Sequence, residues 1–199
     1  MRSSACVLAL ALLGGCSDGL PEIIWSGELI DYAASPEAAA RLCAGTAPRL
    51  DAGAVAIANR LRLQAPPRMT YYWLPEGLDT APCDERVTGG CARRANRRNA
   101  PGETFAMRTM EEHEVVHIYA GEFGRADAFL EEGLAEYLGG VMATPGRGDA
   151  STLYGRQSQL FDPTFYPVAG RFVAELVAQR SLREVMALYG ASDYQDDAE

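Results

Sequence analysis

Short blocks of apolar and aromatic residues predict strands at three places along the chain. Residues 69–74, Met-Thr-Tyr-Tyr-Trp-Leu, are the richest in β-forming side chains. Residues 28–33 and the shorter segment 103–107 are also predicted strands. Because helical patterns lie between and after these blocks, we expect an α+β domain with a small mixed sheet.

Helices are predicted where apolar residues recur three or four positions apart. The sequence Ser-Pro-Glu at 35–37 has the order of an N-cap, a first-turn proline and an acidic first turn, so a helix is expected from there to about residue 43. The pair Pro66-Pro67 closes a second helical pattern. The further predicted helices cover residues 51–63, 108–120, 129–137, 166–176 and 181–189.

Length and composition indicate one folded domain. The chain has 199 residues, of which 48% are hydrophobic and 23% charged, and this excludes a disordered or fibrous protein. All 18 basic residues are arginine, against 27 acidic residues, for a net charge of -9. Such a charge opposes binding to a phosphate backbone, so no nucleic-acid partner is expected. The arginine-rich segment 93–98 suggests an anionic partner at first sight, but we expect a solvated loop there.

The N-terminal residues have the features of a secretory signal. Arg2 precedes the apolar segment 5–13, which is too short to span a bilayer. Residues 13–16, Leu-Gly-Gly-Cys, resemble the lipobox of bacterial lipoproteins; an ordinary signal peptide with an incidental cysteine is the alternative. The resemblance implies secretion across the inner membrane and lipidation of Cys16, and Ser17 after it implies an anchor in the outer membrane, facing the periplasm or the exterior.

This interpretation divides the chain into four segments. Residues 1–15 are the expected signal peptide, 16–27 the lipidated cysteine and a linker, and 28–190 the folded domain. Residues 191–199 are acidic and expected to be a disordered tail. The membrane is therefore an expected partner through the lipid anchor, and the oligomeric state is left open.

Three cysteines remain beyond Cys16, in an oxidising compartment. They allow three pairings, and a turn at Gly89-Gly90 favours a disulfide between Cys83 and Cys91, which leaves Cys43 over. A zinc site built from the three cysteines is the alternative. The missing Cys-x-x-Cys spacing argues against it.

The chain has only two histidines, and they stand four residues apart in the predicted helix 108–120. The sequence His113-Glu-Val-Val-His117 is a His-Glu-x-x-His motif, which on a helix places both imidazoles on one face, able to converge on one metal ion. Glu114 lies beside that face, placed to reach a water on the metal. A chance pair of solvated histidines is the alternative interpretation.

A second motif opposes that alternative. Because the connector 121–125 is short, helices 108–120 and 129–137 should form an antiparallel hairpin that brings a glutamate opposite the histidines. Residues 129–137, Phe-Leu-Glu-Glu-Gly-Leu-Ala-Glu-Tyr, resemble the second helix of gluzincin zinc metallopeptidases, most closely the small peptidase MA-like domains. Residues 166–176 resemble a later helix of that family more weakly.

The resemblance implies a zincin-like fold, a zinc cofactor and peptidase activity on a peptide or protein substrate. It makes Glu132 the third zinc ligand, with Gly133 allowing close approach of the two helices. Glu136 is then expected to accept the free ring N–H of a ligand histidine. The spacing from His117 leaves an alternative in which Glu136 is the ligand. We expect Glu131 to be a solvated charge.

The expected mechanism assigns Glu114 as the base that activates the metal-bound water. With no third histidine, a tyrosine has to stabilise the oxyanion, and Tyr166 is preferred over Tyr154. Residues 103–107 are expected to be an edge strand that pairs with an extended peptide. The alternative is a catalytically inactive zincin-fold lipoprotein that acts as a binding or assembly module.

Overall fold

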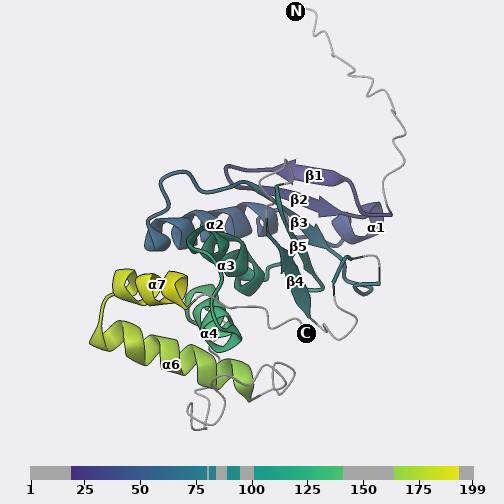
Figure 1. The fold of residues 1–199 in the computed structure, drawn as a ribbon. Helices are drawn as coiled ribbons and strands as arrows, with labels where there is room; N and C mark the ends of the chain where they lie inside the picture. Colours follow the sequence, from purple (N-terminus) through teal and green to yellow (C-terminus); the bar gives the residue numbers. More distant parts are fainter. Residues whose placement is uncertain (1–18, 80, 84–88, 95–100, 141–163, 193–199) are drawn as a thin grey trace, which may run out of the picture.

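The structure is a computed structural model that describes residues 19–79, 81–83, 89–94, 101–140 and 164–192 (Figure 1). Its centre is one mixed sheet with the strand order β1-β2-β3-β5-β4. The inner strands β2, β3 and β5 are parallel, whereas β1 and β4 pair antiparallel at the two edges. The strands are β1 (Ile23–Ser26), β2 (Ile30–Ala34), β3 (Met69–Trp73), β4 (Gly90–Arg93) and β5 (Gly102–Ala106). The predicted α+β class with a small mixed sheet is confirmed.

Helices α2 and α3 pack against the sheet. Helix α4 lies on the other side of α3, between α3 and α6 (Figure 1). The helices are α1 (Pro36–Ala39), α2 (Thr46–Leu61), α3 (Glu112–Ala120), η1 (Gly121–Phe123), α4 (Ala128–Gly139), α6 (Phe165–Gln179) and α7 (Leu182–Ala191). The close contact of α3 with α4 agrees with the predicted hairpin.

Both edges of the sheet differ from the prediction. Strand β1 comes from the segment 16–27 that was expected to be a linker. Residues 103–107 were predicted as an edge strand, which is wrong: β5 lies inside the sheet, between β3 and β4. The edge strand β4 has the sequence Gly-Cys-Ala-Arg, with little β propensity of its own. Its pairing with β5 therefore overrides the local signal.

The disulfide between Cys83 and Cys91 is present, with 6.0 Å between the two Cα atoms, and confirms the predicted pair. Cys91 belongs to β4, so the covalent bond attaches this short edge strand to the preceding loop. Cys43 is a free and exposed thiol. Cys16 and the tail residues 193–199 lie outside the described residues.

Helix α2 begins earlier than predicted, at Thr46 instead of residue 51. Asp51 lies within the helix and its carboxylate accepts the backbone N–H groups of residues 28, 29 and 30. This side chain fixes the start of β2 against α2. Helix α1 is shorter than predicted and ends at Ala39.

Helix α3 begins at residue 112 rather than 108, because aromatic side chains hold the backbone before it. Three consecutive carbonyl oxygens, those of residues 107, 108 and 109, each accept a hydrogen bond from a side chain of β2 or β3. The donors are Tyr32, Tyr71 and Trp73. These hydrogen bonds attach the backbone of residues 107–109 to strands β2 and β3. They therefore fix the start of α3 relative to the sheet.

Two glycines of α4 set its distance from the neighbouring helices. A Cβ on Gly139 would lie 2.8 Å from the backbone nitrogen of His113 and 2.9 Å from its Cα. A Cβ on Gly133 would lie 2.6 Å from the carbonyl oxygen of Ala169 in α6. The prediction that Gly133 allows the hairpin helices to approach is therefore wrong: Gly133 faces α6, and Gly139 is the glycine that faces α3.

We predict that Gly139→Ala destabilises the protein by roughly 1–3 kcal/mol, because the new methyl group meets backbone atoms that cannot rotate away. Urea unfolding followed by circular dichroism measures the loss. Gly45→Ala is the control, since nothing lies within 4 Å of a Cβ at that position. Equal stability of the two variants would contradict the close α3–α4 contact.

Candidate metal centre

Two imidazoles and one carboxylate converge between α3 and α4. His113 and His117 lie one helical turn apart on α3, with 3.1 Å between their Nε2 atoms. Glu132 of α4 places Oε2 2.9 Å from Nε2 of His113 and 3.4 Å from Nε2 of His117. The structure thus brings together the three residues predicted as ligands, and this group could hold a metal ion.

The triangle of ligand atoms has the size that a small cation requires. In a tetrahedral site with ligands about 2.0–2.1 Å from zinc, two ligand atoms lie about 3.3–3.4 Å apart. The three distances here, 2.9, 3.1 and 3.4 Å, are close to that separation. Two imidazole nitrogens and one carboxylate oxygen suit a borderline divalent ion. The donor set therefore fits a small divalent cation, zinc among them, in both size and chemistry.

Glu136 lies on the other side of the His113 ring, with Oε1 3.1 Å from Nδ1. A neutral His113 that donates its Nδ1 proton to this carboxylate presents the Nε2 lone pair toward His117 and Glu132. Of the two glutamates that the sequence left open, Glu132 lies with the Nε2 atoms, and Glu136 lies beside Nδ1 of His113.

The charges of this cluster are strongly coupled. Burial lowers the pKa of His113, but hydrogen bonds with Glu132 and Glu136 outweigh it and raise the pKa to about 10. Burial opposes the charged form of His117 too, while the Glu132 carboxylate raises the pKa of that imidazole. Burial alone would raise the pKa of Glu132, yet the two imidazoles hold it well below its ordinary value. Without a metal ion, the Glu132 carboxylate therefore favours protonation of the imidazoles, while the two rings oppose each other's charge.

Glu114 lies beside the three ligand groups and is not one of them. Its side chain is buried, and burial raises its pKa while His117 and His113 lower it. A Cβ on Gly90, the first residue of β4, would lie 3.1 Å from Cγ of Glu114. The missing side chain at Gly90 thus leaves room for Glu114 against the edge strand, a contact that the sequence did not indicate.

Tyr166 of α6 also reaches the cluster. Its ring lies edge-to-face with the ring of His113, with 5.9 Å between the centroids. Burial raises the pKa of Tyr166 to about 12, so its hydroxyl is a proton donor at neutral pH. Tyr154, the second tyrosine considered, lies outside the described residues.

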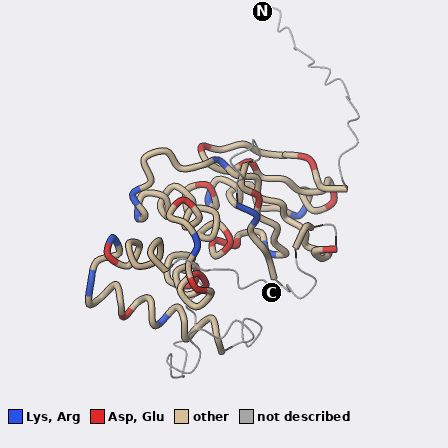
Figure 2. The backbone as a smooth tube through the Cα atoms, viewed as in Figure 1, with Lys and Arg blue, Asp and Glu red and all other residues tan. Residues whose placement is uncertain are grey.

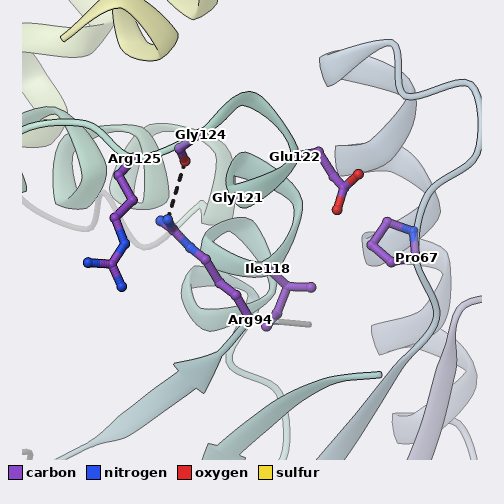
Figure 3. Close-up of a pocket in the computed structure, with 7 residues that line it drawn as sticks. All are labelled: Pro67, Arg94, Ile118, Gly121, Glu122, Gly124 and Arg125. Atoms are coloured by element: carbon purple, nitrogen blue, oxygen red, sulfur yellow. Dashed lines mark hydrogen bonds between the residues drawn. The ribbon is translucent and has the colours of Figure 1, made fainter. Parts of the chain in front are cut away.

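Two charged residues differ from the prediction. Arg94 was expected in a solvated loop, and Glu131 was expected to be a solvated charge. The structure instead pairs them, with 2.9 Å between Nη2 and Oε1 and both side chains about one quarter exposed, at 25% and 22%. Figure 3 shows Arg94 in the wall of a cavity of about 360 Å³, near the C-terminal end of α3. Residues 95–100 of the arginine-rich segment lie outside the described residues.

Comparison with known proteins provides no family for this chain. No protein-family model, no curated protein and no solved structure matches it. Function is therefore inferred from the two sequence motifs and from the geometry of the cluster around His113.

We predict that zinc binding becomes tighter as pH rises, because the metal has to displace protons. The pKa of His113 is raised to about 10 without metal, so its proton is present at pH 7 and is lost only as pH rises through that value. Calorimetric titration at pH 6.5 and 8.5, in buffers of different ionisation enthalpy, should show release of about one proton or more per zinc. A zinc affinity that does not change with pH would contradict the expected displacement of the His113 proton by the metal.

Proposed function

We propose that the protein is a zinc-dependent peptidase with a zincin-like fold. The observation that carries the proposal is the convergence of His113, His117 and Glu132 with a buried carboxylate, Glu114, beside them. Three protein ligands leave a tetrahedral ion one position for water or substrate, which is the arrangement of catalytic rather than structural zinc sites. A site that only binds metal needs no such additional carboxylate.

Each residue of the cluster has a role in this proposal. His113, His117 and Glu132 would hold a zinc ion, which would supply Lewis-acid chemistry to the scissile carbonyl and to a water molecule. Glu114 accepts the proton of the attacking water and passes it to the leaving amine nitrogen. The raised pKa that burial gives Glu114 brings this base closer to neutrality. Tyr166 donates a hydrogen bond to the oxyanion, and Glu136 orients His113.

The unpaired edge of β4 favours a polypeptide as the substrate. Among the described residues, β4 pairs with β5 alone, so its other side presents free main-chain groups. An extended peptide that adds to this edge would pass Gly90 and therefore Glu114. The pairing role expected for residues 103–107 is thus transferred to β4. Main-chain pairing favours peptides without a strong side-chain preference.

We further propose that the protein acts outside the cytoplasm, anchored through Cys16. The lipobox-like residues 13–16 support a lipid anchor, and the disulfide Cys83–Cys91 suits an oxidising compartment.

Acidic and basic positions are distributed over both the sheet and the helical part (Figure 2). None of the helices in the described part of the chain is long and apolar enough to cross a membrane.

We predict that Glu114→Gln lowers kcat for peptide hydrolysis by at least about 100-fold while zinc stays bound, because the base is lost and the ligands remain. His117→Ala should lose both zinc and activity. Metal analysis of the purified proteins and a quenched-fluorescence peptide library give the two readouts.

The matched control is Glu112→Gln, two residues before Glu114 on α3. The Glu112 carboxylate faces Gly53 of α2, so this variant should keep both zinc and activity. A wild-type protein with stoichiometric zinc that cleaves no peptide would contradict the peptidase proposal and favour the binding module. A wild-type protein without stoichiometric metal would contradict both.

A further inference from the structure

Arg94 connects the two helices that carry the candidate metal ligands. It directly follows β4 and donates from Nε to the carbonyl oxygen of His117, at 3.3 Å. Nη1 donates to the carbonyl oxygen of Gly124, at 3.3 Å (Figure 3). Its Nη2 lies 2.9 Å from the carboxylate of Glu131 and 3.3 Å from the hydroxyl of Tyr189. One guanidinium thus contacts α3, the segment after η1, α4 and α7.

Two of the four acceptors of Arg94 belong to a candidate metal ligand or to its neighbour along the chain. His117 is itself a candidate ligand, and Glu131 precedes the ligand Glu132 directly. A guanidinium presents its N–H groups in a planar, rigid fork, so the acceptors it binds are held at a defined separation. The ion pair is partly shielded from water, and its charge-assisted hydrogen bonds are stronger than those between neutral groups.

Gly121 gives independent evidence that the helix end accommodates Arg94. A Cβ on Gly121 would lie 2.7 Å from Cδ of Arg94 and 3.0 Å from its Nε. The φ of Gly121 is -57°, an ordinary helical value that any residue adopts. Backbone conformation therefore does not require glycine here, whereas space for the arginine side chain does.

The carboxylate of Glu131 accepts hydrogen bonds from three different groups. Its Oε1 accepts the backbone N–H of Ala126, at 3.1 Å, and the hydroxyl of Tyr189, at 3.3 Å, besides the guanidinium of Arg94. These contacts fix the start of α4 relative to the end of α3. The separation of His117 and Glu132 depends on that relation, since one ligand lies on each helix.

We propose that Arg94 is a positioning residue of the metal centre, which sets the distance between the ligand atoms of His117 and Glu132 through the His117 carbonyl and the Glu131 carboxylate. This inference rests on the proposed metal site. The hydrogen bonds of Arg94 go to the backbone carbonyl of His117 and to Gly124, Glu131 and Tyr189, and not to the ligand atoms themselves. Its effect is therefore on metal affinity and coordination geometry.

The test compares Arg94→Met and Arg94→Lys with the wild-type full-length protein. Zinc affinity is measured by competition with a chromophoric chelator, and geometry by the visible spectrum of the cobalt(II) form. Arg94→Met should weaken zinc binding about 10–100-fold and change the cobalt bands. Arg94→Lys should recover part of the affinity, because one ammonium keeps the charge without the fork.

Two further changes separate positioning from loss of charge. Gly121→Ala keeps every charge but displaces the Arg94 side chain, so it should weaken zinc binding in the wild type and have little further effect in Arg94→Met. Glu131→Gln removes the charge of the acceptor and should weaken zinc binding too. If Arg94→Met does not fold, the zinc affinities of Gly121→Ala and Glu131→Gln test the inference in its place. Arg93→Met is the control, because its ion pair is with Glu103 of β5 instead.

Folded variants with wild-type zinc affinity and an unchanged cobalt spectrum would overturn the inference, even if they were thermally less stable. That result would leave the proposed function standing, because the wild-type protein would still bind zinc. A wild-type protein that binds no metal would overturn the proposed function and this inference with it. The two failures are therefore distinguished by the wild-type measurement alone.

Discussion

The structure depends on how three carboxylates are accommodated between α3, α4 and the sheet. Glu114 and Glu136 are buried, and Glu132 lies with them around two imidazoles. Isolated charges at such positions are strongly destabilising unless they are paired. The raised pKa values of the two imidazoles favour protons that compensate part of this charge, and the same groups could hold a metal ion in their place. The cluster thus connects α3 to α4.

The rest of the fold restricts where the cluster can form. Aromatic side chains of β2 and β3 bind three consecutive carbonyl groups before α3 and so position its first turn. Gly139 allows α4 to approach the backbone of His113. At the other end of α3, Arg94 joins the His117 carbonyl to α4. The ligand helices are thus held at both ends.

Much of the candidate site was predictable because helical spacing is local. His113 and His117 share a face by periodicity, and the short connector predicted a glutamate opposite them. The choice of Glu132 over Glu136 depended on the resemblance to the gluzincin helix. The Cys83–Cys91 pair followed from a turn. Strand β4 was missed because its four residues have weak β propensity and depend on β5 for pairing. Arg94 and Glu131 were taken for solvated charges because their contacts join segments 37 residues apart, which no local pattern indicates.

The most direct measurement is the zinc K-edge X-ray absorption spectrum of the purified protein. We predict about one zinc per chain, with nitrogen and oxygen ligands at about 2.0–2.2 Å and the scattering pattern of two imidazoles. A first shell that contains sulfur at about 2.3 Å would place the metal on cysteine instead. That spectrum, or the absence of stoichiometric metal after reconstitution, would contradict the account.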